Sequence, residues 1–200
     1  CRSKKKIYSL FKEFDFCPTV FTELPKIEKF PVYAKLDEGQ GSKGAFVVNS
    51  KDELTSIADP ENYVVTEFLP GEELTIDCFT NRKGEVLFVG PRIRKRVFDG
   101  VCVNSETVEA TNLIKDIAKI VSDKIQIRGA WYFQLKKDVN DKYKLLEASV
   151  KIAGNMNVYR GLGVNFPMLM VYDYLDYDVS VIPNNYVLEM DRALFSRYKP

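Results

Sequence analysis

The sequence contains no histidine in its 200 residues. This absence excludes zinc sites built on histidine, Ser-His-Asp triads and Cys-His dyads within the chain. The cysteines are few and show no Cys-x-x-Cys spacing; they are Cys1, Cys17, Cys78 and Cys102. We therefore expect free thiols in a reducing cytoplasm.

An excess of charge of one sign is also missing, since 29 lysines and arginines face 28 acidic residues and the net charge is +1. The charge thus gives no reason to expect nucleic acid or a membrane as a partner. The apolar runs are far shorter than the roughly 20 residues of a bilayer span, and we recognise no signal peptide. A chain of this length and composition can form one globular domain or two small lobes. It starts at Cys1 rather than at methionine, so we expect a fragment or a processed piece of a longer protein.

The hydrophobic periodicity predicts a mixture of helices and strands. The expected helices cover 3–16, a short segment that opens at the capping residue Ser50, 107–125, and a segment from the capping residue Asn165 to about 175. The expected strands cover 19–22, 29–36, 45–49, 63–68, 73–80, 86–89, the two arms of a hairpin that turns at 140–141, and 186–190. The break at Leu69-Pro70-Gly71 predicts two lobes, residues 1–69 and residues 70–200.

A glycine-rich segment follows the expected strand that ends in Lys35. Its glycines would let backbone N–H groups approach a triphosphate closely; they are Gly39, Gly41 and Gly44. Ser42 adds a hydroxyl donor, and Lys35 would place its ammonium on the phosphates as a point charge. The segment is not a P-loop, because its lysine is followed by glycine rather than by serine or threonine. A plain β-turn with a solvated lysine is the alternative.

An acidic turn segment, Glu67 to Glu73, ends the strand expected at 63–68. A strand break of this kind leaves backbone groups unpaired, and these can hydrogen-bond the edge of an adenine. The backbone concerned runs from Glu67 through Phe68 to Leu69. A carboxylate just beyond it, such as that of Glu73, could accept bonds from ribose hydroxyls. A hairpin corner with surface acids is the alternative.

Gln134 and Glu147 occupy the two arms of the expected hairpin. If the register places them on one face, their oxygen atoms suit magnesium. Glu147 lies in an otherwise apolar strand, where a carboxylate is costly unless it is paired or metal-bound. Lys151 follows four residues later and could meet a phosphate oxygen. The alternative is an ion pair between Glu147 and Lys151.

Three arginines, Arg92, Arg94 and Arg96, alternate along an expected strand, so all three should share a face. They could meet a transferred phosphoryl group or an acidic substrate. A solvated charged face is the alternative.

Taken in order, these motifs resemble the ATP-grasp fold, in its carbamoyl-phosphate-synthetase-like branch of amino-acid and peptide ligases. The residues that carry the resemblance are Pro31–Lys35 with Gly39–Gly44, Glu67–Glu73, and Gln134 with Leu146–Gly154. The resemblance extends from the first helix to about Leu175. It implies an α+β fold of two lobes with antiparallel sheets and ATP bound between them.

The resemblance also implies a role for each group of residues. The residues that would bind ATP are Lys35, Gly39, Gly41, Ser42, Gly44, Glu67, Phe68, Leu69 and Glu73. The ligands of Mg²⁺, or of Mn²⁺ in its place, would be Gln134, Glu147 and Ser149. The residues that would act on the transferred phosphoryl group as catalytic residues are Lys151, Arg94 and Arg96. A second phosphate-binding lysine would be one of Lys4, Lys5 and Lys6.

Two positions depart from the family pattern. The metal-binding glutamate is usually followed two residues later by asparagine, where this chain has Ser149, a weaker ligand. A basic residue, usually arginine, comes next, and Lys151 keeps its charge but loses the bidentate fork. The family also carries an N-terminal α/β domain, which we expect as a separate domain or partner subunit.

The resemblance favours the core of an ATP-dependent carboxylate–amine ligase. Such an enzyme forms an acyl phosphate from a small-molecule carboxylate and transfers the acyl group to an amine. One alternative is a non-catalytic, regulatory module that binds nucleotide without turnover. Another is a domain that binds an acidic ligand and no nucleotide.

Overall fold

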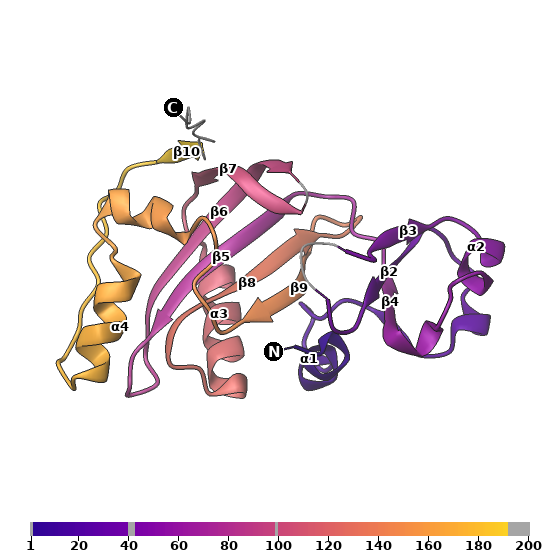
Figure 1. The fold of residues 1–200 in the computed structure, drawn as a ribbon, viewed down its shortest axis with the longest axis horizontal. Helices are drawn as coiled ribbons and strands as arrows, with labels where there is room; N and C mark the ends of the chain where they lie inside the picture. The colour runs from indigo at the N-terminus through magenta and orange to yellow at the C-terminus, as the bar shows by residue number, and fades with distance from the viewer. Residues whose placement is uncertain (1, 40–42, 99, 192–200) are drawn as a thin grey trace, which may run out of the picture.

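The computed structural model describes residues 2–39, 43–98 and 100–191, and these form two antiparallel sheets (Figure 1). The small sheet has the order β1-β4-β2-β3, with β1 (Val20–Phe21), β2 (Val32–Leu36), β3 (Phe46–Val48) and β4 (Tyr63–Glu67). The large sheet has the order β10-β7-β6-β5-β8-β9, with β5 (Glu73–Thr80), β6 (Val86–Phe98), β7 (Val101–Thr107), β8 (Gly129–Lys137), β9 (Tyr143–Ser149) and β10 (Glu189–Asp191). The predicted α+β class with antiparallel sheets is confirmed.

Helices cover both faces of the large sheet (Figure 1). The helices of the chain are α1 (Lys4–Phe11), α2 (Lys51–Thr55), α3 (Asn112–Ile125) and α4 (Phe166–Tyr174), with short 3₁₀ turns at Leu24–Lys26, Pro60–Asn62 and Met156–Leu162. Helix α2 packs against the small sheet instead, where Leu54 joins its core. On one face of the large sheet, α1 and α3 share a buried core with the sheet that includes Phe11, Ile117 and Trp131. On the other face, the turn at 156–162 and α4 enclose Phe79 and Phe88. Among the described residues, no helix has the length and apolar character of a membrane span.

The connection between the sheets is the segment from Phe68 to Glu72, which joins β4 to β5. We keep the proposed boundary between the lobes, 1–69 and 70–200, in this segment. Helix α1 nevertheless packs into the core of the large sheet, because Ile7, Tyr8 and Phe11 are buried there. The N-terminal helix therefore ties the first lobe to the second.

The hairpin of β6 and β7 differs from the sequence prediction. The strand expected at 86–89 and the strand expected for the three arginines form one continuous strand, β6, which reaches Phe98, and β7 is a strand that was not among those expected. The second half of β7 is polar, from Asn104 to Thr107, which weakens the strand pattern. The following helix begins at Asn112 rather than at Thr107, because the hydroxyl of Thr111 accepts from the backbone N–H of Ile114 and caps it there.

Helix α4 is capped at its start and is held to the large sheet by polar contacts near its end. At its start the side chain of Asn165 accepts from Met168 N at 3.4 Å, the cap that the sequence predicts. Near its end the carboxylate of Asp173, which is 3% exposed, accepts from Arg128 Nε at 2.8 Å and from Arg82 N at 2.8 Å. Arg82 lies in the turn between β5 and β6, and Arg128 directly precedes β8. The orientation of α4 on the sheet is thus set by buried polar contacts.

Candidate functional site

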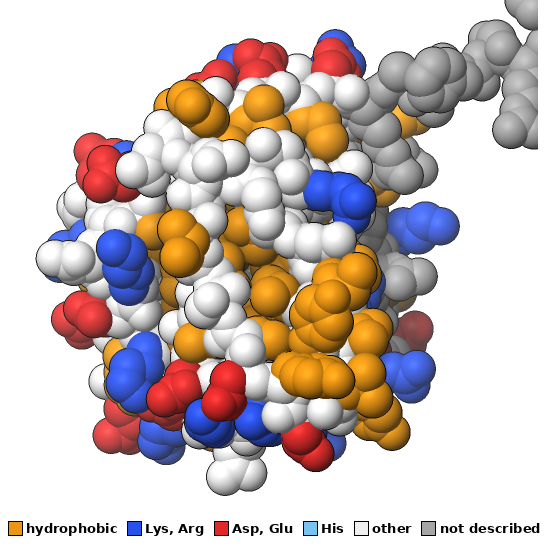
Figure 2. All heavy atoms as spheres, turned by 90° about the vertical axis from the view of Figure 1, so that its left-hand side faces the viewer, with side chains coloured by type: hydrophobic (Ala, Val, Ile, Leu, Met, Phe, Trp, Pro, Cys, Tyr) orange, Lys and Arg blue, Asp and Glu red, His pale blue; other side chains and the backbone are white. Residues whose placement is uncertain are grey.

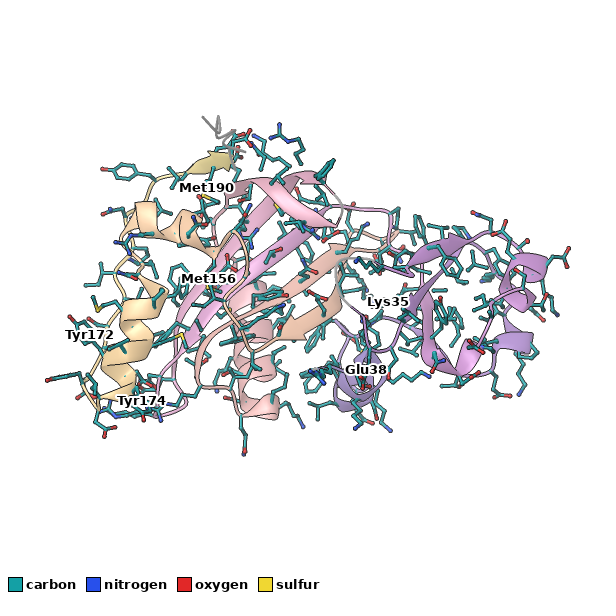
Figure 3. All side chains as sticks on the ribbon, viewed as in Figure 1. Lys35, Glu38, Met156, Tyr172, Tyr174 and Met190 are labelled. Carbon is teal, nitrogen blue, oxygen red and sulfur yellow. The ribbon has the colours of Figure 1, made fainter. Side chains whose placement is uncertain are left out.

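A cavity lies between the two sheets and receives side chains from both. Figure 3 shows Lys35 at this junction. The lining residues are Lys4, Tyr33, Lys35, Leu36, Gly39, Lys43, Ala45, Thr66, Glu67, Phe68, Leu69, Glu73, Arg94, Gln134, Lys136, Leu146 and Glu147. Five of these side chains are lysine or arginine and three are glutamate, so the cavity carries an excess of positive charge suited to a polyanion.

Lys35 reaches from the small sheet to the large one. Its ammonium donates to Tyr8 Oη at 2.6 Å and to Leu146 O at 3.3 Å. Tyr8 Oη in turn donates to Leu146 O at 2.7 Å, so α1, β2 and β9 meet at this point. Burial first, and then the neighbouring ammonium of Lys4, lower the pKa of Lys35 to about 8, although Glu147 partly opposes the shift. No described carboxylate forms an ion pair with this buried ammonium, which leaves its charge available to an anion.

Lys4 is the lysine of the N-terminal helix that faces the cavity. Its ammonium donates to Leu36 O at 2.9 Å and Asp37 O at 3.1 Å, and burial lowers its pKa. Lys5 instead donates to Glu61 O, away from the lining residues. The phase of α1 is fixed by its cap, because the side chain of Ser3 accepts from Lys6 N. Of the three candidates, Lys4 has the position of a second phosphate-facing lysine.

The glycine-rich segment is described in part. Gly39 lines the cavity, whereas Gly41 and Ser42 lie outside the described residues. Gly44 has φ +66°, and a Cβ there would lie 2.8 Å from Leu36 Cδ1, so glycine is required for the turn into β3. Gly44 is not among the residues that line the empty cavity, and its assignment to the nucleotide site stays a prediction.

The segment after β4 borders the cavity as the sequence predicts, with Glu67, Phe68 and Leu69 in its lining. The segment then lies against β8, because Gly71 N donates to Lys137 O at 3.0 Å. A Cβ on Gly71 would lie 2.6 Å from Lys137 Cβ, so only glycine permits this approach. Glu67 is partly engaged, since its Oε1 accepts from Thr19 N at 2.7 Å.

The three arginines of β6 have separate surroundings. Arg94 lines the cavity, pairs with Glu73 and donates to Gly100 O at 3.0 Å. Arg92 is buried and does not line the cavity, and its Nε donates to Asp77 Oδ2 at 2.7 Å. Arg96 pairs with Asp191 of β10 at 2.6 Å on the exposed edge.

Three predicted site residues are not brought to the cavity. Arg96 is turned away because the β6–β7 register shifts between Arg94 and Arg96, which breaks the expected alternation. Lys151 is exposed, beyond the end of β9, and it does not line the cavity. Ser149 stands opposite Tyr132 in the ladder and is likewise absent from the lining. The assignments of Arg96, Lys151 and Ser149 as site residues therefore stay predictions, and these three side chains lie outside the lining of the empty cavity.

Gln134 and Glu147 stand directly opposite each other in the β8–β9 ladder, as the sequence predicts, and both line the cavity. In the amide orientation that satisfies its neighbours, Gln134 donates to Glu147 Oε1 at 3.2 Å and accepts from Thr75 Oγ1 and Arg94 Nη1, each at 3.3 Å. Glu147 Oε1 also accepts from Tyr132 Oη at 3.2 Å. The pKa of Tyr132 is raised to about 12, mainly by burial and next by the negative charge of Glu147.

These two residues fit a magnesium ion that is bound partly by protein oxygen atoms and partly by phosphate oxygen atoms of a nucleotide. Mg²⁺ is commonly held by one or two carboxylates together with waters and phosphate oxygens. Glu147 supplies one carboxylate, and rotation of the Gln134 amide would turn its oxygen toward the same space. Among the described residues, no group of three or more acidic, cysteine or histidine side chains is placed to hold a metal alone. A metal here would therefore depend on oxygen atoms of the ligand.

The sequence reasoning missed Lys136, which lines the cavity on β8. It stands opposite Glu73 in the β5–β8 ladder. The available signal was its spacing, because residues two apart in a strand share a face and Gln134 was already assigned to the cavity.

A family model described as "ATP-grasp in the biosynthetic pathway with Ter operon" matches residues 59–192. No curated protein matches the chain significantly. Three solved structures share the fold. The biotin carboxylase domain of 2-oxoglutarate carboxylase from Hydrogenobacter thermophilus has a TM-score of 0.78 and 13% identity, over 94% of this chain and 49% of that one.

The second structure is the N5-carboxyaminoimidazole ribonucleotide synthetase from Thermotoga maritima, with a TM-score of 0.73 and 14% identity over 94% of this chain and 52% of that one. The third is the L-amino acid ligase from Bacillus licheniformis, with a TM-score of 0.64 and 21% identity over 88% of this chain and 48% of that one. The chain thus spans about half the length of these proteins.

Proposed function

Because this chain belongs to the ATP-grasp family, we propose that it binds Mg²⁺-ATP between its two sheets as the core of an ATP-dependent carboxylate–amine ligase. The observation that carries the proposal is the grouping of Lys4, Lys35 and Glu147, from three elements, in one positively charged cavity. One similar structure was solved with MgADP, ADP and bicarbonate, and another is an L-amino acid ligase. Both support a ligand of this kind.

The lysines of the cavity suit the phosphates of a nucleotide, whereas the segment after β4 and Glu73 suit its adenosine. The ammonium groups of Lys4 and Lys35 would bind the phosphates, under the glycine-rich segment. Backbone groups of Phe68 and Leu69 would hydrogen-bond the adenine. Glu73 would accept from the ribose hydroxyls with the carboxylate oxygen that does not pair with Arg94. The nucleotide would therefore span the two sheets.

Glu147 and Gln134 would hold the metal, which when bound neutralises negative charge on the phosphates. In the proposed reaction a carboxylate oxygen of the substrate attacks the γ-phosphorus and ADP leaves. The amine then attacks the acyl carbon and inorganic phosphate leaves. The lysines of this chain would stabilise the charge on the transferring phosphoryl group without themselves exchanging a proton.

The test is calorimetric titration of the chain with ATP in the presence of Mg²⁺, followed by an assay of ADP release with a panel of amino acids. We expect binding heat, and ADP release that requires both a carboxylate and an amine. Absence of heat at millimolar nucleotide would contradict the proposal as a whole.

A second candidate function is a nucleotide-binding module without turnover. The exposed position of Lys151 and the absence of Ser149 from the cavity favour it, because the family pattern has asparagine and arginine at these positions. Binding heat without ADP release would support this alternative.

Nucleotide affinity should decrease as the pH rises above about 8, the pKa of Lys35 in the empty cavity. A bound phosphate favours the charged ammonium, so the complex holds this proton more tightly than the free protein does. Affinity is then constant below about pH 8 and falls about tenfold per pH unit at most above it. The measurement is titration from pH 7 to pH 9 in buffers of different ionisation enthalpy, which counts the protons taken up. Lys35→Arg keeps its charge throughout this range and should remove this contribution.

A further inference from the structure

The outer face of α4 and the segment after it carry large apolar side chains on the surface. Helix α4 reads FPMLMVYDY and is apolar on nearly all sides, a pattern typical of a buried helix rather than of a surface helix. Tyr174 is 78% exposed and Ile182 is 89% exposed. Figure 2 shows these apolar side chains gathered on one side of the molecule, and Figure 3 shows Tyr172 and Tyr174 directed away from the body.

A groove runs between α4 and the segment 177–182, with a volume of about 540 Å³. Apolar side chains such as Met168, Leu169 and Val181 form most of its wall. The groove is held open by ordered contacts, since Asp173 fixes α4 and Asn184 N donates to Leu162 O at 2.9 Å. The face thus presents a preformed hollow beside protruding side chains.

This apolar surface is larger than a soluble monomer usually exposes. Seven large side chains of residues 168–182 are each between 44% and 89% exposed. With about 150–250 Å² for a large side chain, the exposed area is roughly 800 Å². The largest apolar patch of a typical monomer is about 300–600 Å², whereas each partner of a standard protein–protein interface contributes about 800 Å². The area therefore matches half of an interface.

The charges around the face cancel one another. Three cations, Arg82, Lys83 and Arg128, border it together with three acids, Asp173, Asp176 and Asp178. They pair among themselves, as Lys83 Nζ does with Asp178 Oδ1 at 2.9 Å. A neutral border gives no attraction for nucleic acid or for an anionic lipid surface. It suits a partner that is itself apolar and neutral.

We propose that this face binds the same face of a second copy of the chain, as a two-fold symmetric dimer. A two-fold interface requires a surface that is complementary to itself. Here the groove and the exposed side chains of Tyr172 and Ile182, which border it, lie on one face, so each copy can offer these side chains to the groove of the other. The net charge of +1 gives the two copies almost no electrostatic repulsion.

The experiment is sedimentation equilibrium of the 200-residue chain across micromolar concentrations, with no nucleotide present. We expect reversible dimerisation, and Tyr172→Glu and Ile182→Glu should each weaken it by about tenfold or more. Leu113→Glu is the matched control, because Leu113 is 56% exposed at the start of α3, on the opposite face of the large sheet. Ile182 is 89% exposed, so its variant keeps the test valid even if Tyr172→Glu unfolds.

Two results would overturn the dimer. One is a monomer at every concentration, which would assign the face to a different folded domain. The other is a dimer that neither glutamate variant weakens. The mass of the particle is independent of nucleotide binding, so failure of the dimer and failure of the proposed ligase function are read separately.

Discussion

Replacing Lys35 by methionine is expected to abolish nucleotide binding while making the empty protein more stable. Lys35 is 7% exposed, and its ammonium bonds only neutral oxygen atoms, those of Tyr8 and Leu146. Loss of a charge-assisted contact with phosphate should weaken Mg²⁺-ATP binding at least about 100-fold. Removal of a poorly compensated buried charge should raise the free energy of unfolding by about 1–3 kcal/mol.

The gain in stability has a defined dependence on pH. Lys35 has a pKa of about 8 in the folded chain, against the ordinary 10.5 of an exposed lysine. Between these values the unfolded chain binds more protons, so the Lys35 contribution makes wild-type stability rise with pH across this window. The difference between variant and wild type should be largest at pH 8 and below. Thermal unfolding at several pH values measures it, and Lys29→Met, at an exposed lysine, should change neither stability nor binding.

Replacing Glu147 by glutamine should remove the effect of Mg²⁺ on nucleotide binding. Glu147 is the carboxylate that stands opposite Gln134, and the variant keeps its shape while losing its charge. Two neutral amides hold Mg²⁺ poorly, so ATP affinity should become nearly the same with and without the metal. If the wild type releases ADP, the rate should fall at least about 100-fold.

The matched control for this variant is Glu72→Gln. Glu72 is exposed and contacts Tyr143 Oη, outside the cavity lining. It should retain the metal dependence of the wild type. Paired titrations with and without Mg²⁺ provide the comparison, and an unchanged metal dependence in Glu147→Gln would remove Glu147 from the proposed metal site.

The sequence predicted well those positions that depend on local pattern. The turn predicted at 140–141 places Gln134 opposite Glu147, and the structure has this pair, but the ladder reaches it through a register shift between Gln134 and Leu135 that the sequence did not predict. The choice of Lys4 over its neighbours could not be made, because it depends on the helix phase set by Ser3. The regular alternation expected for Arg92, Arg94 and Arg96 is interrupted by a register shift between Arg94 and Arg96, and such a shift leaves no clear mark in the residues. Lys136 could have been inferred from its spacing to Gln134 on the same strand, but its position beside the segment after β4 depends on strand neighbours that the sequence does not show.

The bond between Lys35 and Leu146 O also bears on how the two sheets move. Lys35 belongs to the small sheet and Leu146 to the large one, so separating the sheets would return the ammonium to water. In the empty protein that return recovers hydration free energy, and the buried lysine favours an open arrangement. A triphosphate in the cavity reverses the balance, because it compensates the charge where it lies. If the two sheets separate at all, we therefore expect this one side chain to make their closure depend on the ligand.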